Sequence, residues 1–424
     1  MKILVVGGGG REHALVWKLA QSPLAEEIYC APGNAGIADL AECVNIPAED
    51  VDTLLEFALA EEIGLTVVGP EAPLAAGIVD KFTAAGLKIF GPTQAAALIE
   101  GSKALAKEIM EKYNIPTAAY ASFTDQAAAE EYVRTQGAPI VVKADGLAAG
   151  KGVVVAMTEQ EALDAVADML SGNAFGSAGA KVVIEEYLEG EEVSVLAFSD
   201  GKTVLPMVSA QDHKRVFDGD EGPNTGGMGA YSPAPVYTGE LAEQTLRLVL
   251  QPAVDGMLAE GREYKGVLYA GLMVTPKGLK VLEFNARFGD PETQAVLMRL
   301  ESDLVEIMLA VVDGRLDECT LKWSDDAAVC VVVASGGYPG KYEKGQPISG
   351  LDVEYPDTVV FHAGTKFVDQ QVVANGGRVL GVTAHGATIA RAIEKAYAAV
   401  DGIHYDGCFS RRDIGYRALQ REAE

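Results

Sequence analysis

The first hundred residues alternate short apolar runs with stretches of helical periodicity. The apolar runs are nearly continuous, which is typical of strands buried on both faces of a parallel sheet. Between them, apolar side chains recur every three or four positions, as on one face of a helix. This alternation predicts a doubly wound parallel sheet, a Rossmann-like domain, over residues 1–102. The strands are expected at 3–6, 65–69 and 87–90, and the helices at 15–20, 54–59 and 74–85.

The pattern changes again further along the chain. Ser102 is placed to cap a helix with an apolar stripe, and a small α+β stretch follows over about 121–190. Longer strands and a helix come next, and the last hundred residues form another unit of short β runs and a helix. We therefore predict a multidomain α/β and α+β chain, divided at 1–102, 103–327 and 328–424. The later strands are expected at 193–198, 204–209, 267–275, 279–285, 328–334, 359–362 and 378–383, and the later helices at 159–170, 240–259 and 387–400.

The chain of 424 residues carries a formal net charge of −27. This argues against a nucleic-acid partner, which needs clustered Lys and Arg, while a local cationic pocket still admits small anionic substrates. No apolar run approaches the ~18 residues of a membrane span, and the N-terminal apolar stretch is too short for a signal peptide. Five scattered cysteines without metal-ligand spacing fit a reducing compartment. We expect a cytoplasmic protein without a membrane partner, with a monomer favoured over a weak dimer.

The run VLEFNARFGDPETQ, residues 281–294, places polar side chains in a segment that otherwise resembles a buried strand. Side chains two apart point to the same face, so Glu283, Asn285 and Arg287 share a face if the strand stays regular. A carboxylate and an amide oxygen suit Mg²⁺ held together with substrate phosphates, and an arginine can grip a transferring phosphoryl group. The alternative is a surface strand with its polar residues outward. The apolar neighbours favour the functional interpretation, because a buried carboxylate without a partner is costly.

Two glycine-rich turns are candidate phosphate-binding loops. VVGGGGREHAL, residues 5–15, lacks the third glycine and the acidic residue of a nicotinamide dinucleotide site, but its backbone N–H groups at a helix start would suit a phosphate. A tight turn without ligand is the alternative. VVKADGLAAGKGVVV, residues 141–155, has the wrong spacing for a Walker A loop. It could be a flap over phosphates with Lys143 at a strand end, or a hairpin with a solvated lysine.

Two further segments carry charge without a decisive pattern. In EEYLEGEEVS, residues 185–194, the acidic pairs are typical of solvated faces, although Glu192 could begin a strand that faces a ligand. QDHKRVFDGDEGPNTGGMGAYSP, residues 211–233, is too long for an idle connector. No His or Cys accompanies His213 at metal-ligand spacing, so no zinc site is predicted.

Taken in order, these motifs resemble the ATP-grasp ligases, and among them most closely the phosphoribosylamine–glycine ligase (glycinamide ribonucleotide synthetase) family. APGNAG, VGPEAPLAAGIVD and EGSKALAKEIM add to the resemblance, which covers essentially the whole chain. QDHKR…NTGGMGAYSP together with NARFGDPETQ points to this family rather than to ATP-grasp enzymes in general. The resemblance implies an enzyme that uses ATP and Mg²⁺ or Mn²⁺ to join glycine to 5-phosphoribosylamine. Its products would be glycinamide ribonucleotide, ADP and phosphate, in purine biosynthesis.

The resemblance also implies roles for residues of this sequence. Glu283 and Asn285 would hold the metal, Arg287 would steady the phosphoryl group in flight, and Lys143 and Asp212 would take part in catalysis. The phosphates of ATP would contact Lys103 and Lys143, and its ribose would contact Glu192. The flap over the phosphates would be formed by Asp145, Gly146, Gly150, Lys151 and Gly152, and the hinge that lines the adenine by Glu185, Tyr187 and Leu188. Glycine and phosphoribosylamine would contact Gly9, Gly10, Arg11, Asn34, Asp212, Lys214, Asp290 and Pro291.

Two positions leave alternatives open. Related ligases often carry a second acidic metal ligand about a dozen residues before the Glu, and here that offset lands on Gly271. Lys107 lies one helical turn beyond Lys103 and is an alternative phosphate ligand.

The implied reaction passes through glycyl phosphate, and it needs no side-chain nucleophile. Neither a G-x-S-x-G motif nor a Cys–His pairing is evident in the sequence. Asp212 or Asp290 would orient the attacking amine or accept its proton. The competing hypotheses are another ATP-grasp enzyme that acts on bicarbonate or formate, an oxidoreductase, and a nucleotide sensor without turnover. Glycine-dependent phosphate release would separate them.

Overall fold

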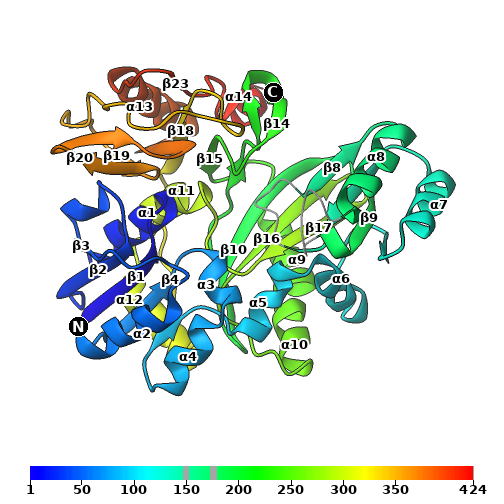
Figure 1. Cartoon of the computed structure of the whole chain (residues 1–424), viewed down its shortest axis with the longest axis horizontal. Coiled ribbons are helices and arrows are strands. Elements are labelled where there is room, and N and C mark those ends of the chain that lie inside the picture. Colours follow the sequence, from blue (N-terminus) through cyan, green and yellow to red (C-terminus); the bar gives the residue numbers. More distant parts are fainter. Residues whose placement is uncertain (147–151, 172–178, 424) are drawn as a thin grey trace.

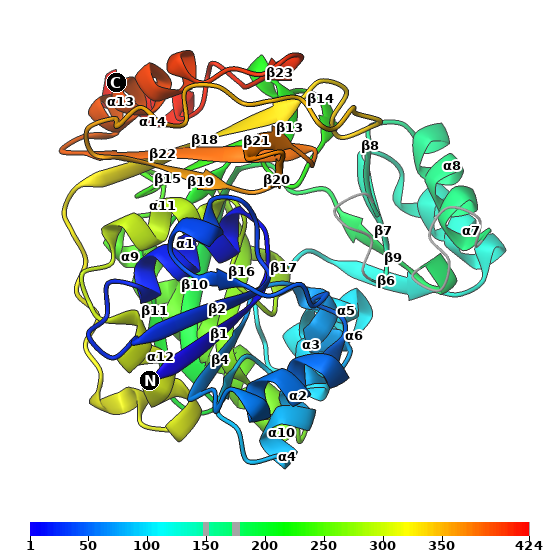
Figure 2. The same ribbon diagram turned by 60° about the vertical axis from the view of Figure 1, so that its left-hand side comes forward.

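The structure is a computed structural model that describes residues 1–146, 152–171 and 179–423. Separate sheets form an N-terminal unit, a small lobe, a central unit and a C-terminal unit. The small lobe projects at the right of Figure 1, away from the N-terminal sheet, and the C-terminal sheet lies above the N-terminal sheet (Figures 1 and 2). The multidomain α/β and α+β architecture expected from the sequence is confirmed. None of the helices in the described residues is both long and apolar enough to cross a membrane.

The N-terminal sheet has parallel strands in the order β3-β2-β1-β4-β5. Ile3 and Val5 of β1 pack with α1, whereas Leu4 and Val6 pack with α2 and α4. Helices therefore cover both faces, which explains the uninterrupted apolar run and confirms the doubly wound sheet. The elements are β1 (Lys2–Gly7), α1 (Gly10–Leu19), β2 (Glu27–Pro32), β3 (Glu42–Cys43), α2 (Val51–Ala60), β4 (Leu65–Val68), α3 (Glu71–Ala75), α4 (Ile78–Ala84), β5 (Ile89–Phe90) and α5 (Gln94–Gly101).

The single helix predicted near 74–85 is wrong. Two short helices, α3 and α4, occupy this stretch, and Gly77 lies between them with φ of +81°. A left-handed residue cannot continue a right-handed helix, and glycine adopts this conformation without steric cost.

The small lobe is an antiparallel sheet in the order β6-β9-β7-β8. One face packs against α7 and α8. Because side chains alternate, the opposite face carries Lys143 and Glu185, and Lys143 reaches the central sheet. The elements are α6 (Lys103–Lys112), which leads into the lobe, β6 (Tyr120–Phe123), α7 (Gln126–Gln136), β7 (Ile140–Ala144), β8 (Val153–Ala156), α8 (Glu159–Leu170) and β9 (Val182–Glu186).

The central sheet is antiparallel, in the order β11-β10-β16-β17. Its faces pack against α10 on one side and α12 on the other. The predicted helix at 240–259 is α9 and α10 joined by a π-helical turn at Leu246–Leu250. The elements are β10 (Glu191–Asp200), β11 (Val204–Pro206), α9 (Gly239–Thr245), α10 (Gln251–Ala259), β16 (Lys265–Thr275), β17 (Gly278–Asn285), α11 (Glu292–Arg299) and α12 (Leu304–Asp313).

A β-bulge interrupts β17 just before the predicted metal ligands. The pairing with β16 shifts by one residue, which leaves Leu282 as the extra residue. In an unbroken strand Glu283 would share the core face of Val281. The bulge instead gives that face to the buried Phe284 and leaves Glu283 and Asn285 half-buried on the opposite face. The strand is therefore not regular, and the irregularity is what exposes the polar pair.

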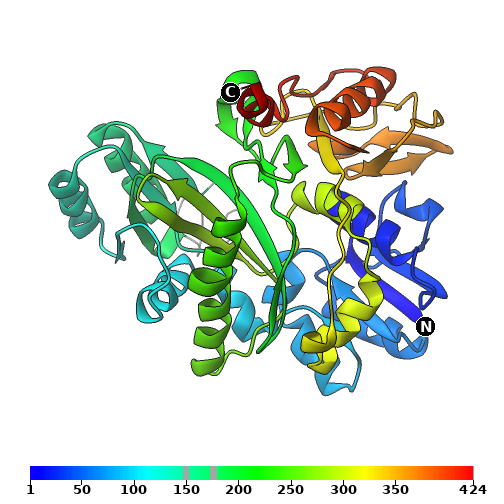
Figure 3. The same ribbon diagram turned by 180° about the vertical axis from the view of Figure 1, so that it is seen from behind.

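The C-terminal sheet has the order β12-β15-β18-β22-β19, with β23 paired to β18. Its first two strands come from the long 211–233 segment, so this segment joins the central unit to the C-terminal one. Helix α13 packs on β18 and β22, and Figure 3 shows it above the orange strands, with α14 in dark red beside the C-terminus. The elements are β12 (Gln211–Asp212), β13 (Arg215–Phe217), β14 (Glu221–Asn224), β15 (Gly229–Ser232), β18 (Ala327–Ser335), β19 (Thr358–His362), β20 (Thr365–Val368), β21 (Gln371–Ala374), β22 (Arg378–Gly386), α13 (Ile389–Gly402), β23 (Cys408–Phe409) and α14 (Tyr416–Ala423).

Candidate active site

Two lysines and a glutamate form a buried charged cluster between α6 and the small lobe. Nζ of Lys143 lies 3.0 Å from Oε1 of Glu185, and Nζ of Lys107 lies 2.9 Å from Oε2. Lys107 also donates to Oγ1 of Thr117 at 2.7 Å, and Lys143 donates to the carbonyl of Leu282 at 3.2 Å. Burial lowers the pKa of Lys107 to about 8, although Glu185 opposes this shift. Two cations share one carboxylate, so the cluster keeps an excess of positive charge.

Lys103 points instead toward the start of the flap segment. Its Nζ donates to the carbonyl of Gly146 at 3.2 Å. The carboxylate of Asp145 accepts from the backbone N–H of Ala104 at 2.7 Å, so the same segment binds the first turn of α6. Burial lowers the pKa of Lys103, and the strongest opposing charge is Glu283. Lys103 therefore lies on the side of the predicted metal ligands.

The other residues predicted to bind nucleotide are only partly covered by the structure. Gly150 and Lys151 lie outside the described residues. Gly152 accepts a backbone hydrogen bond from the end of β7 at 2.8 Å. Tyr187 and Leu188 are half-buried on the connection from β9 to β10. Their contacts with a nucleotide stay a prediction.

Glu283 and Asn285 have the properties of metal ligands. Among the described residues, neither side chain has a hydrogen-bond or ion-pair partner. Burial alone would raise the pKa of Glu283, but Lys214, Lys143 and Lys103 together lower it, so the carboxylate is ionised at neutral pH. Over the same residues no three His, Cys, Asp or Glu side chains gather as a metal-binding cluster. A divalent cation here would therefore complete its shell with phosphate and water oxygens, as Mg²⁺ commonly does.

Gly271 lies directly opposite Glu283 in the pairing of β16 with β17. A Cβ on Gly271 would lie 3.2 Å from Cγ of Glu283, so the glycine leaves room for that side chain. Another carboxylate, Glu292, is buried and accepts from the hydroxyl groups of Tyr269 at 2.8 Å and Ser194 at 3.3 Å. No role was predicted for Glu292 from the sequence; an acidic residue in the first turn of a helix is common for electrostatic reasons alone.

Arg287 lies beyond the end of β17 and is held by two carboxylates. Its Nη2 lies 3.0 Å from Oε1 of Glu100, and its Nε lies 3.4 Å from Oε2 of Glu71. Glu100 also accepts from the backbone N–H of Ala286 at 2.7 Å. Burial disfavours the charge of Arg287, but the two carboxylates outweigh it and raise the pKa. The expected row of three side chains on one strand face is not formed, because Arg287 lies beyond the strand end and binds Glu71 and Glu100 of the N-terminal unit instead.

Asp212, Lys214 and Glu192 form the opposite side of the site. Nζ of Lys214 pairs with Oε2 of Glu192, so a residue predicted to contact glycine or phosphoribosylamine is joined to one predicted to contact the ribose of ATP. Burial raises the pKa of Asp212 to about 7, with Lys214 opposing and Glu292 and Glu192 adding to the shift. A carboxyl group with this pKa can accept a proton near neutral pH.

Asp290 lies where the N-terminal, central and C-terminal units meet. Its carboxylate accepts from Nε2 of Gln294 at 2.9 Å and lies 3.4 Å from Nη2 of Arg378. Arg378 also donates to the carbonyls of Asp290 at 2.7 Å and Gly227 at 3.3 Å. Arg378 and Arg11 lower the pKa of Asp290 despite its burial. Sequence reasoning missed Arg378, whose only signal is a lone arginine between two glycines and a buried strand.

The glycine-rich loop is bound by the protein's own side chains. The backbone N–H of Gly9 donates to Glu12 at 2.6 Å, and Nε of Arg11 donates to the same carboxylate at 2.6 Å. Asn34 donates to two backbone carbonyls and accepts from two backbone N–H groups. Glu12 therefore occupies the helix start that a dinucleotide pyrophosphate would need, which argues against the oxidoreductase alternative. The contacts of Arg11 and Asn34 with phosphoribosylamine stay a prediction.

Two other predicted substrate residues are closely packed. A Cβ on Gly10 would lie 2.6 Å from Nε2 of Gln294. Gly227, with φ of +115°, lies against Pro291, because a Cβ on it would lie 2.5 Å from Cδ of the proline. The glycines allow the loops that meet at Asp290 to approach one another.

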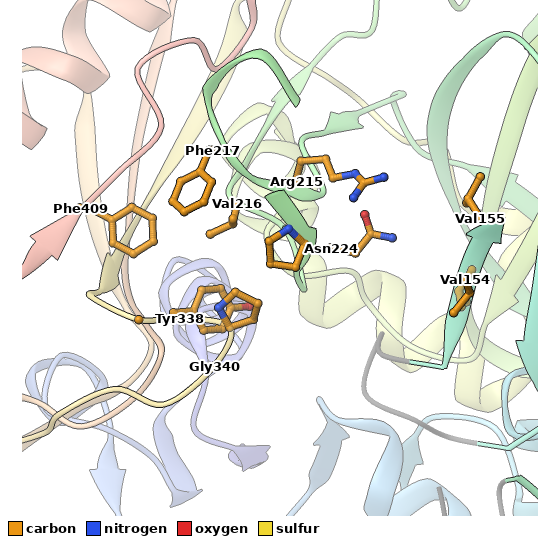
Figure 4. Close-up of a pocket in the computed structure, with 13 residues that line it drawn as sticks. Val154, Val155, Arg215, Val216, Phe217, Asn224, Tyr338, Gly340 and Phe409 are labelled. Carbon is orange, nitrogen blue, oxygen red and sulfur yellow. The ribbon is translucent and has the colours of Figure 1, made fainter. Parts of the chain in front are cut away.

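A cavity of about 800 Å³ lies next to the segment that carries Asp212 and Lys214. Figure 4 shows Val154 and Val155 of β8 on one side and Phe217, Tyr338 and Phe409 on the other. Arg215 and Asn224 of the β13–β14 hairpin lie between them in this view, and the hairpin begins one residue after Lys214. The cavity is therefore open between the small lobe and the C-terminal unit, next to the predicted substrate residues.

A lysine-lined small lobe that faces an antiparallel sheet with a pair of oxygen donors defines the ATP-grasp class of enzymes. Models of the N domain, the ATP-grasp (A) domain and the C domain of phosphoribosylglycinamide synthetase match residues 1–100, 101–293 and 328–417. The chain belongs to this family. The resemblance and the class of enzyme expected from the sequence are confirmed.

Relatives of known name are similar to this chain over its full length, in sequence and in structure. The phosphoribosylamine–glycine ligase of Vibrio cholerae is 59% identical over 426 residues, which cover 100% of this chain and 99% of that protein. The ligase of Escherichia coli is 58% identical and covers 100% of both chains. The crystal structure of the Thermotoga maritima ligase is 33% identical, with a TM-score of 0.86 over 98% of this chain and 100% of that one. A biotin carboxylase domain from Hydrogenobacter thermophilus shares the fold at 17% identity, with a TM-score of 0.76 over 96% and 91%.

Proposed function

We propose that this protein is an ATP-dependent ligase that joins glycine to 5-phosphoribosylamine in purine biosynthesis, giving glycinamide ribonucleotide, ADP and phosphate. Its family and the names of its full-length relatives support this function. The observation that carries the proposal is the pair Glu283 and Asn285. Their oxygens are unpartnered among the described residues. The charges of Lys143, Lys103 and Lys214 all act on Glu283, and Lys214 also acts on the buried carboxyl group of Asp212.

In the first step, an oxygen of the glycine carboxylate attacks the γ-phosphorus of ATP. The bond from that phosphorus to the bridging oxygen breaks, ADP leaves, and glycyl phosphate forms. The carboxylate is already ionised at neutral pH, so no general base is needed. Catalysis then depends on positioning and on charge neutralisation, for which Lys143 and Arg287 are the assigned residues.

In the second step, the amine nitrogen of phosphoribosylamine attacks the carbonyl carbon of glycyl phosphate. A carbon–nitrogen bond forms, the carbon–oxygen bond to phosphate breaks, and the nitrogen releases a proton. Asp212 is better suited than Asp290 to accept that proton, because burial raises its pKa to about 7. Asp290 has a lowered pKa and is bound to Arg378 and Gln294.

Glu283 and Asn285 fit a divalent cation, Mg²⁺ or Mn²⁺, by their donor types and their free lone pairs. Such an ion, when bound, neutralises charge on the transferring phosphoryl group. Lys103, whose pKa is lowered by burial against the opposing charge of Glu283, is the cation assigned to share this role toward the phosphates.

We further propose that the functional units are those expected from the sequence, at 1–102, 103–327 and 328–424, with the small lobe at about 121–190 over the nucleotide. The five cysteines are all free, which supports action in the reducing cytoplasm. Only small-molecule partners, glycine, phosphoribosylamine and ATP, are required.

The decisive experiment measures phosphate and ADP release by the purified protein. Phosphoribosylamine is labile, so it is formed in the assay from ribose 5-phosphate and ammonia. We expect release only when glycine and the amine are both present. Release that follows bicarbonate or formate instead would indicate another ATP-grasp activity, and ATP binding without any turnover would indicate a nucleotide sensor.

A further inference from the structure

The segment that carries Asp212 and Lys214 is held by the end of the chain. We call residues 411–417 the C-terminal clamp. Arg411 in the clamp has a fully buried side chain, and its Nη1 donates to Oδ1 of Asp220 at 2.9 Å and to the carbonyl of Arg215 at 3.0 Å. Arg215 directly follows Lys214, so one guanidinium binds both ends of the loop that starts at the candidate site.

The clamp also fixes the orientation of Arg411 and closes on the loop backbone. Asp413 accepts from Nε and Nη2 of Arg411 at 2.8 and 2.7 Å, and it accepts from the backbone N–H of Gly219 at 2.9 Å. The backbone N–H of Arg412 donates to Asp218 at 2.8 Å. The clamp and the loop each donate hydrogen bonds to the other, so a shift of one segment would break contacts of both.

His213 connects the clamp to the site most directly, because it lies between Asp212 and Lys214 in the sequence. Its side chain is fully buried, and its Nε2 accepts from the backbone N–H of Gly415 at 3.0 Å. The ring proton is therefore assigned to Nδ1, which lies 3.8 Å from Oδ1 of Asp220. Burial lowers the pKa of His213, so the ring stays neutral.

Helix α14, which begins inside the clamp, contacts the start of β10, next to Glu192 of the candidate site. Arg421 pairs with Glu191 at the start of β10. The next residue, Glu192, pairs with Lys214. The end of the chain thus binds immediately beside both partners of this ion pair.

We propose that the C-terminal clamp positions Asp212 and Lys214 for the second step of the reaction, in which the amine attacks glycyl phosphate. Arg411 and His213 are positioning residues that touch no substrate themselves. This inference rests on the proposed function. A loop that bears reacting groups must be held closely, since an error of about 1 Å can cost about a hundredfold in rate. The buried guanidinium, shared between Asp220 and Asp413, provides that support from outside the site.

The first experiment compares Arg411→Lys with Arg412→Lys in the full-length protein. The ammonium of the first variant cannot bridge Asp220, Asp413 and a carbonyl together. Arg412 is the matched control, because its exposed side chain pairs with Asp401 and lies 5.6 Å from the ring centroid of Tyr397, and both of these partners are outside the loop that Arg411 binds. We expect Arg411→Lys to raise the KM for glycine or the amine, or to lower kcat, by about 10- to 100-fold. Nucleotide affinity, measured by ADP titration, should stay within about twofold.

The second experiment tests His213 by replacement and rescue. The amide oxygen of Gln can accept from the N–H of Gly415, whereas Leu cannot. We expect His213→Leu to reproduce the loss seen in Arg411→Lys, and His213→Gln to recover most of the activity. Circular dichroism and ADP binding identify variants that have simply unfolded.

The inference is overturned if folded Arg411→Lys has steady-state constants within about twofold of the parent. It is also overturned if ADP affinity falls as much as substrate turnover does, since that would indicate a general structural effect. Failure of the proposed function looks different, because the parent protein itself would then release no phosphate with glycine and phosphoribosylamine.

Discussion

Arg287 and Glu100 form an ion pair of 3.0 Å that connects the end of β17 to α5. Glu71, from the N-terminal unit, lies on the other side of the same guanidinium at 3.4 Å. The pKa of Glu100 is raised by burial, and Arg287 is the main group that opposes this. The residue proposed to steady the phosphoryl group is therefore also needed to keep a buried carboxylate charged.

Replacing Arg287 should affect turnover and stability separately. We expect Arg287→Ala to lower kcat by about 10²–10⁴-fold, as removal of a transition-state donor does. The same change leaves Glu100 buried without its partner, which should lower the free energy of unfolding by about 3–5 kcal/mol. Steady-state kinetics and urea unfolding measure the two effects.

A double variant, Arg287→Met with Glu100→Gln, serves as the control, because it removes both charges of the pair. Its stability should return toward that of the parent while its turnover stays low. If turnover returns together with stability, the arginine has only a structural role.

The raised pKa of Asp212 predicts a pH dependence. As the proton acceptor, Asp212 must be ionised, so kcat/KM should fall as the pH drops below about 7. Glu292 adds to the raised pKa, so Glu292→Gln should move this acid limb to lower pH. Asp212→Asn should abolish the limb along with most of the activity. A pH–rate profile that is flat between pH 6 and 8 in the parent would contradict the assignment.

The metal site predicts an altered Mg²⁺ requirement when either the ligand or the space beside it changes. Glu283→Gln should raise the Mg²⁺ concentration needed for half-maximal activity, because a neutral amide binds the cation less tightly. Gly271→Ala should act in the same direction and more weakly, since its Cβ would lie 3.2 Å from Cγ of Glu283. Gly239→Ala is the control, because nothing lies within 4 Å of the added carbon. Unchanged metal titrations would place the site elsewhere.

Two buried histidines predict a loss of stability in acid. The backbone N–H of His362 donates to Nδ1 of His13 at 2.8 Å, and this contact joins the C-terminal unit to α1. Burial lowers the pKa of His13 to about 3 and that of His362 to about 4, from an ordinary value of 6.5. Between those values the unfolded chain binds protons that the folded chain does not, so the free energy of unfolding should fall as the pH drops from 6.5 toward 4.

For one such histidine the loss at pH 4 is about 3 kcal/mol. Carboxylates also titrate in this range, so the measurement is the difference between the parent and His362→Gln in urea unfolding at pH 7 and pH 4. The variant keeps the backbone N–H that binds His13. Equal pH dependence of the two proteins would show that His362 is not responsible.

Local patterns were sufficient to predict most of the secondary structure. The uninterrupted apolar run of β1 follows from burial on both faces. Helix α8 has the predicted bounds, and its start is fixed by a capping box that Thr158 and Glu161 form. The helix near 74–85 was wrong because a single glycine with positive φ gives no signal in apolar periodicity. The family could also be recognised from the sequence, because each of its motifs is a short run of residues that can be read without knowing the fold.

What the sequence by itself determined was the set of elements, the family, and the residue types that could hold a metal and phosphates. The tertiary structure alone decided which of them meet. The bulge at Leu282 turns Glu283 and Asn285 away from the core, Glu100 and Glu71 orient Arg287, and Arg378 reaches Asp290 from 88 positions further along the chain. The reason is physical: periodicity reports how each segment meets its immediate surroundings, whereas register shifts and charge pairs depend on segments that only the folded chain brings together.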